Sequence, residues 1–342
     1  MSSRSATSGS YRYHVRFMAV SPVRIGDLKI RPGTLDDAQF VADVFTAIDP
    51  DEPTDPLIMR YQWEHSPPEQ VFERFVAEKD GKPVGFAGHA HMPWEKMPKR
   101  FGFVGGDLLP AFRTRERLGA LYDFVEDVSR REGTMIFTAW TREIEDLKIE
   151  FLTGRGYREE RRGRWWELEL GPNRDRLLRL REESRARMRR EGVALLTLAD
   201  DADAQKYRKA WTSYEESVQD TPTTVPIVPQ PLEQFLKWLR RPGIREDRLW
   251  IARYADDVVG ISVLQYPTVR GHVETAWTGT KRAVRGKGVA RALKLETIAQ
   301  AISLGVPRIR TGNDSANAPI LHLNEELGYR SIPGSIQLLK DA

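Results

Sequence analysis

The 342-residue sequence predicts a mixed α/β fold that occurs twice along the chain. Two observations predict it. Strand–turn–strand segments recur at a nearly constant spacing, and in the second half antiparallel strands precede a strand–helix–strand unit. The length allows two domains that each bury a core, and a composition of 40% apolar and 30% charged residues is typical of a globular protein.

The internal repeat is carried by three matches that come in the same order in both halves. They lie 175, 172 and 163 residues apart, which indicates a duplication with about a dozen extra residues early in the second copy. The matched segments are 77–85 with 252–260, 156–158 with 328–330, and 34–37 with 197–201.

A connecting helix is expected between the two copies. Residues 172–192 contain eight Arg and four acidic residues, with Pro172 at the expected start and Gly192 at the expected end. The interspersed acidic residues favour a solvated helix with i,i+4 pairs over a basic arm for phosphate-rich partners. The predicted divisions are an N-terminal extension at 1–27, a first domain at 28–170, the connecting helix at 171–192 and a second domain at 193–342.

The second domain shows the expected elements in order. Apolar runs indicate strands, amphipathic runs indicate helices, and Gly305 with Pro307 ends the longest helix. We expect strands at 193–198, 249–253, 258–266, 272–280, 308–311 and 335–339, helices at 201–217, 231–239, 289–304 and 319–327, and a proline-rich loop at 220–230.

A glycine-rich turn, Arg285-Gly-Lys-Gly-Val-Ala290, joins the strand at 272–280 to the longest helix. The start of a helix presents unpaired N–H groups at the positive end of its dipole, which suits a pyrophosphate. The two glycines let the backbone approach the anion, and Arg285 and Lys287 add charge.

A plain strand-to-helix connection is the alternative reading. Walker and dinucleotide-binding loops fit less well, because the sequence lacks GxxxxGK[ST] and carries Arg291 where the dinucleotide fingerprint needs a small residue.

The motif Arg285-x-x-Gly288-x-Ala290, after a strand that ends Thr278-Gly-Thr280, resembles the [Q/R]-x-x-G-x-[G/A] signature of Gcn5-related N-acetyltransferases (GNAT family). Segment 313–329 is similar to the second motif of that family, an asparagine-led helix that ends in Leu-Gly-aromatic. The resemblance covers 193–342 well and 28–170 weakly. It implies two tandem GNAT folds, each a mostly antiparallel twisted sheet flanked by helices, with an intact C-terminal copy and a degenerate N-terminal copy.

The resemblance also implies acetyl-CoA as co-substrate and direct attack of an amine on its thioester in a ternary complex. The pyrophosphate would sit on 285–290, the pantetheine arm would lie where two strands splay apart, and an N–H within 277–279 would polarise the thioester. The implied coenzyme-binding residues are Trp277, Thr278, Gly279, Thr280, Arg285, Gly286, Lys287, Gly288, Val289, Ala290, Asn313, Asn317 and Asn324.

A general base is needed because an alkylamine with a pKa of about 10.4 is mostly protonated at pH 7. Glu274 is the candidate: it lies four residues before Thr278, and alternate residues of a strand share a face. An exposed surface carboxylate is the other interpretation of Glu274. Candidate acceptor-binding residues are Tyr214, Asp220 and Thr221.

One position of the second copy and two of the first depart from the family pattern. Asn324 stands where many members have a tyrosine that protonates the leaving thiolate, so the donor of that proton is left open. In the first copy, Glu116 corresponds to Gly288 and Gly102 to Glu274, which predicts that this copy has lost acetyl-CoA binding.

The function expected is therefore N-acetylation of a small-molecule primary amine by the C-terminal domain (EC 2.3.1.-). The alternatives are acyl transfer from another acyl-CoA or from a charged tRNA, and a non-catalytic acyl-CoA sensor.

The sequence has no cysteine, and the pair His89 and His91 has no convincing metal-ligand spacing, so no metal is expected. A net charge of only +4 argues against a nucleic-acid partner, and no stretch approaches the ~18 apolar residues of a membrane span. We expect a cytoplasmic monomer or homodimer.

Overall fold

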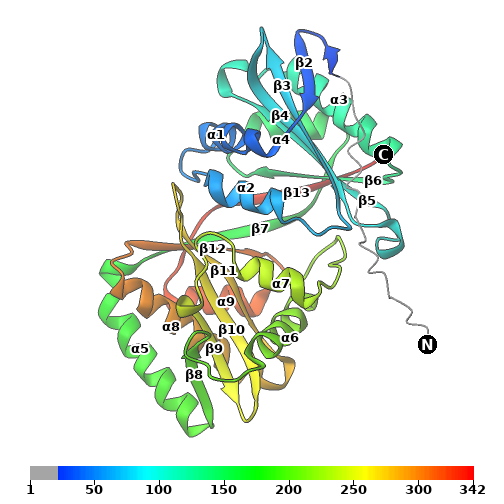
Figure 1. Ribbon diagram of the computed structural model, residues 1–342. Helices are drawn as coiled ribbons and strands as arrows, with labels where there is room; N and C mark the ends of the chain where they lie inside the picture. Colours follow the sequence, from blue (N-terminus) through cyan, green and yellow to red (C-terminus); the bar gives the residue numbers. More distant parts are fainter. Residues whose placement is uncertain (1–21) are drawn as a thin grey trace, which may run out of the picture.

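The computed structural model describes residues 22–342. Most of the predicted N-terminal extension, residues 1–21, lies outside this range, and the rest of it contains the short strand β1 (Val23–Ile25). Within the described chain, thirteen strands form one continuous sheet that runs through both halves (Figure 1). The fold is the mixed α/β class that the sequence predicts.

The N-terminal half alternates strands and helices in the order expected of a mixed sheet. Its central hairpin turns at Asp80 and Gly81, which both have positive φ angles. Its elements after β1 are β2 (Leu28–Pro32), α1 (Ala38–Ile48), α2 (Pro56–Glu64), β3 (Val71–Lys79), β4 (Lys82–His91), β5 (Phe101–Leu108), α3 (Arg115–Arg131), β6 (Ile136–Arg142), α4 (Asp146–Gly154) and β7 (Arg158–Glu169).

The C-terminal half repeats this order after the connecting helix α5 (Leu170–Arg190). Most predicted elements are present with small shifts at their ends. Helix α6 starts later than predicted because the carboxylates of Asp201 and Asp203 accept backbone N–H groups in the turns before it. The elements are β8 (Val193–Thr197), α6 (Lys206–Gln219), α7 (Leu232–Leu239), β9 (Leu249–Tyr254), β10 (Asp257–Gln265), β11 (Val273–Thr280), α8 (Val289–Ser303), β12 (Arg308–Asp314), α9 (Ala318–Leu327) and β13 (Arg330–Asp341).

The repeat found in the sequence corresponds to equivalent hairpins. In β3–β4 Ala77 lies opposite Gly85, and in β9–β10 Ala252 lies opposite Gly260. In each half the next strand pairs antiparallel with the hairpin and then meets a parallel neighbour, β6 in the first half and β12 in the second.

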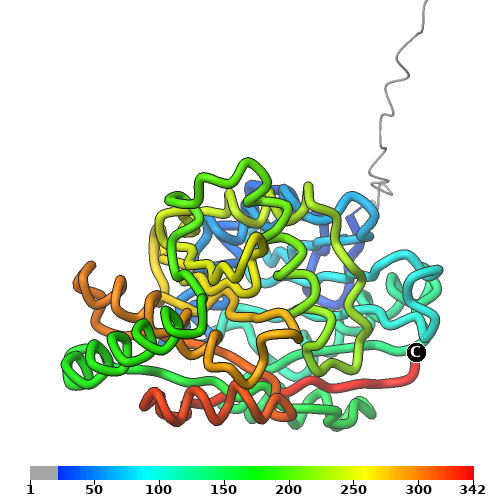
Figure 2. Tube along the Cα trace, turned by 90° about the horizontal axis from the view of Figure 1, so that it is seen from below, coloured from blue at the N-terminus to red at the C-terminus, as the bar shows by residue number. Residues whose placement is uncertain are grey.

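The last strands of the two halves are exchanged. The spatial order is β1-β2-β3-β4-β5-β6-β13-β7-β12-β11-β10-β9-β8. Strand β7 therefore pairs with β12 of the other half, and β13, drawn in red in Figure 1, returns to pair with β6. Figure 2 shows the red trace of β13 leaving α9 and running along the base of that view to the C-terminus.

The hydrophobic cores follow this exchange. Ile336 and Leu338 of β13 are buried with the core of the N-terminal half, and Trp166 and Leu168 of β7 are buried with the core behind α8. Each half therefore completes its core with a strand from the other half. The predicted domain boundaries at 170 and 193 remain a prediction about the chain, since the sheet itself has no break there.

Helix α5 packs along α8 through buried charge. The carboxylate of Glu296 on α8 is 1% exposed and accepts hydrogen bonds from Arg181 and Arg185 of α5. Arg176 donates to the backbone carbonyl of Leu327 at 2.5 Å, at the end of α9. These arginines stabilise the C-terminal half, because a buried carboxylate needs charged hydrogen-bond partners.

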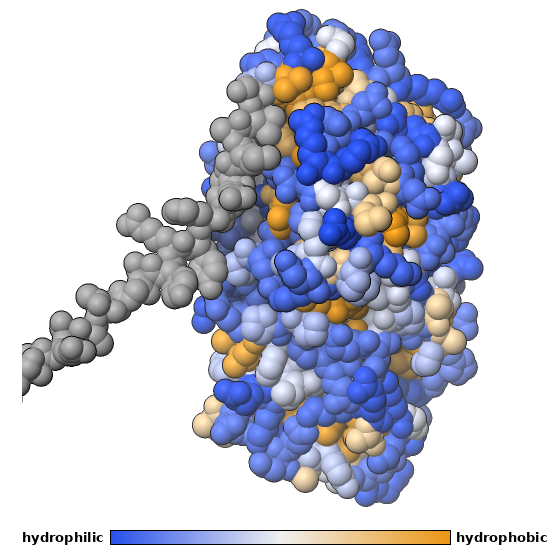
Figure 3. Space-filling view, turned by 90° about the vertical axis from the view of Figure 1, so that its right-hand side faces the viewer, coloured by the Kyte–Doolittle hydropathy of each residue, from blue (hydrophilic) through white to orange (hydrophobic). Residues whose placement is uncertain are grey.

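The molecular surface is largely polar. The face in Figure 3 is mostly hydrophilic, with small separate apolar patches. Among the described residues, no helix is long and apolar enough to cross a membrane.

Candidate active site

A cleft opens where β11 and β12 diverge. The two strands pair in parallel only at Val273 with Ile309 and Glu274 with Arg310, and then separate toward Thr280. The cleft has a volume of about 540 Å³ and lies between the two strands, the start of α8 and the start of α9. Two strands that separate leave unpaired backbone groups on their facing edges, and these can bind an extended, amide-containing ligand.

The glycine turn at 285–288 presents a row of free donors at the mouth of this cleft. Gly286 and Gly288 have φ angles of 74° and 85°, which favour glycine, and Gly288 is the residue before the first turn of α8. Within residues 22–342, the backbone N–H groups of Gly286 and of 288–291 have no hydrogen-bond acceptor. A helix start with several free N–H groups is a binding site for phosphate.

Arg187 of α5 adds a positive charge beside the turn, and the sequence did not point to it. A side chain at Gly288 would meet the Arg187 guanidinium, since a Cβ atom built there lies 3.1 Å from Nη1. Its charge and the absence of a side chain at Gly288 both suit a phosphate.

Asp220 lies at the same mouth, between two arginines. Its carboxylate pairs with Arg285 at 2.6 Å and also with Arg282. The hydrogen bond from Arg282, followed by that from Arg285, lowers the pKa of Asp220. Asp220 was predicted to bind the acceptor, which stays a prediction; in the structure its carboxylate lines the cleft and lies against the arginine of the coenzyme motif.

The predicted coenzyme-binding residues fall into three groups. Most line the cleft, a second group forms the turn and helix start at its mouth, and Asn324 is buried behind the wall. Thr221 also lines the cleft, whereas Tyr214 lines a different pocket. The predicted coenzyme-binding residues that line the cleft are Trp277, Thr278, Gly279, Thr280, Arg285, Ala290, Asn313 and Asn317, and those of the turn are Gly286, Lys287, Gly288 and Val289.

A β-bulge in β11 corrects the argument that led to Glu274. Thr278 lies opposite Ser262, and Glu274 lies opposite Gln265, so Ala276 has no partner on β10. One extra residue reverses the alternation of faces. Glu274 and Thr278 therefore lie on opposite faces of the sheet, and the prediction that they share a face is wrong.

The surroundings of Glu274 nevertheless suit a proton acceptor. The side chain is solvent-exposed by surface area, yet protein atoms crowd around its carboxylate. This crowding and the neighbouring carboxylate of Glu52 raise the pKa of Glu274 to about 7, against the opposing effect of Arg310. Glu52 comes from the N-terminal half and pairs with Arg310 at 2.6 Å. The charged neighbours of Glu274 therefore come from both halves.

Lys294 is a titratable residue of the cleft that the sequence did not single out. It lies on the second turn of α8, lines the cleft and is only 2% exposed. Its Nζ donates to Asn324 Oδ1 at 2.8 Å, and Asn324 Nδ2 donates to Asn313 Oδ1 at 2.8 Å. Burial without a nearby carboxylate lowers the pKa of Lys294 to about 7.

The equivalent region of the N-terminal half is filled by ion pairs. Asp107, which is 1% exposed, pairs with Arg113 and with Lys148, each at 2.8 Å. The turn before α3 has no residue with positive φ, and the side chain of Thr114 caps the helix by accepting from Arg117 N–H. Within the described residues, the start of α3 therefore lacks the two positive-φ glycines of the C-terminal turn, and the Thr114 cap occupies one of its N–H groups.

The sheet register also corrects one correspondence between the halves. Phe103 lies opposite Ala90, as Glu274 lies opposite Gln265, whereas Gly102 takes the place of Val273. The shift arises because β5 lacks the bulge of β11. No carboxylate stands at the position of Glu274 in the first half under either correspondence.

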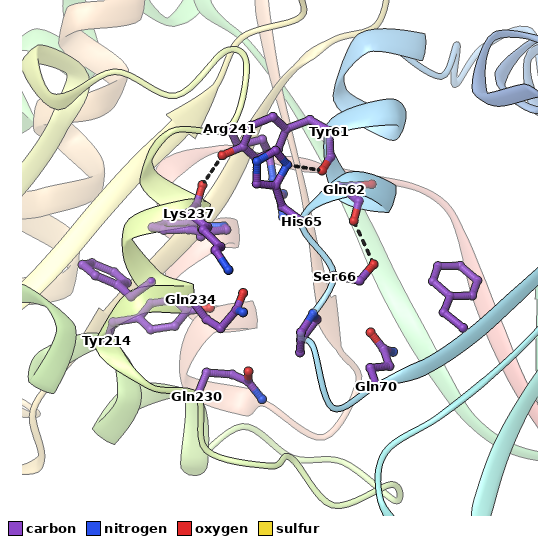
Figure 4. A pocket seen from close by; sticks show the side chains of 14 residues that line it. Tyr61, Gln62, His65, Ser66, Gln70, Tyr214, Gln230, Gln234, Lys237 and Arg241 are labelled. Atoms are coloured by element: carbon purple, nitrogen blue, oxygen red, sulfur yellow. Dashed lines mark hydrogen bonds between the residues drawn. The ribbon is translucent and has the colours of Figure 1, made fainter. Parts of the chain in front are cut away.

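A second pocket, of about 350 Å³, lies between the halves. In Figure 4, Tyr61, Gln62 and His65 of α2 face Tyr214, Gln234 and Lys237 of the C-terminal half across the pocket. The lining residues include no carboxylate. Arg241 also lines the pocket, and within the described chain its guanidinium has no acidic partner. Burial lowers the pKa of Arg241.

The pocket and the cleft lie close to one another. The ring of Tyr214 from the pocket wall packs edge-on against Trp277 of the cleft wall, with ring centroids 5.2 Å apart.

The pair His89 and His91 has ordinary structural surroundings. The ring of His89 is fully buried and contacts the carbonyl of Phe103, and His91 stacks on Trp94 with ring centroids 3.8 Å apart. Among residues 22–342, no three His, Asp or Glu side chains come together as metal ligands would.

Comparisons with known proteins agree with this geometry. Residues 205–329 match the model of the acetyltransferase (GNAT) family. No curated protein matches the chain in sequence. Among solved structures, a tandem GNAT protein from the clavulanic acid biosynthesis pathway, solved without acetyl-CoA, is 15% identical with a TM-score of 0.68, over 92% of this chain and 98% of that one. A GCN5-related N-acetyltransferase from Sphaerobacter thermophilus is 17% identical with a TM-score of 0.66, over 93% of this chain and 97% of that one.

At these identities the structures establish the fold alone, and the family model describes the C-terminal half. The C-terminal half therefore matches the acetyltransferase (GNAT) family, and the two halves together have the fold of tandem GNAT proteins.

Proposed function

We propose that the protein transfers the acetyl group of acetyl-CoA to the primary amine of a small molecule, and that the C-terminal half carries the reaction. The observation that carries this proposal is the glycine turn at 285–288, whose free N–H groups lie at the mouth of the cleft between β11 and β12. Phosphates bind at the turn, and the extended arm follows the unpaired strand edges.

The cleft offers a second sign of a polar ligand. The hydroxyl of Thr275, a lining residue, is buried beside the hydroxyl of Tyr329 and has no other polar partner in the described structure. A hydroxyl can both donate and accept hydrogen bonds, so one in a cleft wall with a single protein partner can also bond a ligand.

The acceptor approaches from the face of the sheet that carries Glu274. Glu274 takes the proton from the ammonium form of the amine, directly or through water, and the neutral nitrogen then attacks the thioester carbon. We place the body of the acceptor in the pocket between the halves, because Tyr214 connects its wall to Trp277 of the cleft. The unpaired Arg241 in that pocket favours an acceptor that also carries a negative charge.

A charged tRNA as donor has less support. The arginines at 176, 181 and 185 of α5 are engaged within the protein, by Glu296 and by backbone carbonyls at the end of α9. They are therefore not free to bind a phosphate backbone.

Calorimetry with acetyl-CoA tests the proposal, followed by an assay of thiol release with a panel of small amines. The wild type should bind acetyl-CoA, and Gly288→Glu should lose binding because it adds a side chain and a negative charge at the phosphate turn. Gly305→Glu is the matched control: Gly305 also has positive φ, with open space around it, at the other end of α8. Binding that is unaffected by Gly288→Glu, or that is absent from the wild type, would overturn the proposal.

A further inference from the structure

We propose that Lys294 is the proton donor to the sulfur of coenzyme A when the thioester breaks. The inference rests on the proposed function. It assigns a group that neither of the two sequence motifs contains.

The first observation concerns which titratable groups line the cleft. Four do so: Asp220, Arg285, Lys294 and Asp314. Asp220 pairs with Arg285 at 2.6 Å, and Asp314 pairs with Arg161 at 2.8 Å. Lys294 is the titratable lining residue of the described cleft that has no ion-pair partner, so its proton is not committed to another charge.

The second observation is how the ammonium of Lys294 is held. Asn324 Oδ1 accepts one of its hydrogens at 2.8 Å, and the ring centroid of Tyr329 lies 4.8 Å from Nζ. The amide of Asn324 is fixed in turn by Asn313 on β12. An ammonium has three hydrogens, so this arrangement orients the group and leaves others to face the cleft.

The side chains that face Lys294 from α9, β12 and β11 are uncharged. Helix α9 presents Asn324, β12 presents Asn313, β11 presents Thr275, and Tyr329 follows α9. Burial among neutral groups lowers the pKa of Lys294 to about 7. A free thiol has a pKa of about 8.5, so an ammonium this acidic gives its proton readily to a thiolate.

The third observation is the position of Lys294 along the helix. It lies six residues after Gly288, which at 1.5 Å per residue is about 9 Å from the phosphate turn. Helix α8 runs back along β11: Leu293 contacts Gly260 beside Thr280, and Leu295 packs with Val273 at the start of the strand. Lys294 therefore lies inward from the phosphate turn, in the direction in which the reactive end of the coenzyme extends.

The proposed step balances. The amine nitrogen forms a bond to the thioester carbon, and the carbon–sulfur bond then breaks with its electron pair on sulfur. Lys294 gives one proton to that sulfur, and the proton lost by the amine nitrogen goes to Glu274 or to water. Amide and thiol are the products, and solvent restores the proton of Lys294.

The test uses the full chain with coenzyme A, acetyl-CoA and desulfo-coenzyme A. The pKa of the thiol in bound coenzyme A is measured from the ultraviolet absorbance of its thiolate. In the wild type we expect this pKa to be at least one unit lower than in Lys294→Met, a tenfold difference in the thiol–thiolate equilibrium. Lys294→Arg keeps the charge and should keep the lowered pKa, which guards against a Met variant that folds poorly.

The controls separate this inference from the proposed function. Lys340→Met removes a lysine that pairs with Glu126 in the N-terminal half, and Tyr329→Phe removes the hydroxyl of the ring that lies beside Lys294 Nζ; both should leave the pKa of the bound thiol unchanged. Acetyl-CoA and desulfo-coenzyme A should bind the wild type and Lys294→Met about equally. If they bind but the thiol pKa is the same with and without Lys294, or depends on Tyr329 instead, the role of Lys294 is refuted and the coenzyme site stands. If neither coenzyme binds the wild type, both proposals fail.

Discussion

At the residue scale, the chemistry depends on two groups whose pKa values are displaced toward neutrality from opposite sides. Crowding and Glu52 raise the pKa of Glu274 to about 7, and burial lowers that of Lys294 to about 7. An acid and a base with pKa values near the working pH are each partly in the required form. Because one belongs to the face of β11 toward α6 and the other to α8, they serve the amine and the sulfur separately.

Glu274→Gln tests the base. Glu274 must be ionised to accept a proton, so it should give kcat/KM for an amine acceptor a rise with pH near 7 in the wild type, whereas loss of the Lys294 proton should give a fall, and together they make the profile bell-shaped. In the glutamine variant this rise should disappear, and kcat/KM should be lower by roughly 10²-fold or more. Glu52→Gln removes a like charge and should shift the rise to lower pH. An unchanged profile in Glu274→Gln would mean that the residue is an ordinary surface carboxylate.

Asp220→Asn tests the role of the carboxylate at the mouth of the cleft. Removal of its charge frees Arg285 for a phosphate, so acetyl-CoA should bind about two- to fivefold more tightly, the modest size expected of a partly exposed pair. Asp257→Asn, which removes the partner of Lys281 outside the cleft, is the control. Weaker binding of the amine with unchanged coenzyme affinity would instead support the original assignment of Asp220 to the acceptor.

The sequence predicted the residues of the turn well and those of the cleft interior only in part. Gly286 and Gly288 have a local physical signature, since a positive φ at a helix start requires glycine. The bulge at Ala276 has none, because alanine fits a regular strand equally well, and the argument from alternating faces failed for that reason. Lys294 was missed because its burial depends on helices and strands that are distant in sequence.

At the element scale, α8 connects the two sequence motifs: the glycine turn at 285–290 precedes it, and Asn324 of the motif at 313–329 accepts from its Lys294. Its first turn is the proposed phosphate site, its second carries Lys294, and its third carries the buried Glu296 that accepts hydrogen bonds from α5. A helix covered by the sheet on one side and by α5 on the other has little free surface. Its sequence therefore lacks the single apolar face that marks a surface helix, although its ends at Gly288 and Gly305 were predictable.

The exchanged strand β13 gives an element-scale prediction. Leu338 is 2% exposed in the core of the N-terminal half, so Leu338→Ala should destabilise the protein by roughly 2–5 kcal/mol. The loss of stability should appear as faster hydrogen exchange in β5 and β6, and exchange in α8 should change less. Leu339→Ala, on the same strand but only half-buried, is the control and should cost less. Faster exchange confined to the C-terminal half would contradict the observed pairing of β13 with β6.

At the scale of the whole molecule, the two halves form one sheet with different duties. The N-terminal half has filled its own cleft with Asp107, Arg113 and Lys148, and it contributes Glu52 beside Glu274 and α2 to the pocket between the halves. The duplication and the overall fold class were predictable from the repeat. The strand exchange was not, because β7 and β13 end equivalent repeats and nothing local decides which half each one joins.

Hydrogen exchange measured with and without acetyl-CoA tests the central claim most directly. The claim is that the free N–H groups of Gly286 and of 288–291 hold the phosphates of the coenzyme. Acetyl-CoA should therefore slow exchange at these amides and along β11, and leave the matching turn before α3 in the N-terminal half unchanged. Protection at the N-terminal turn, or no protection at 286–291 at saturating acetyl-CoA, would contradict the account.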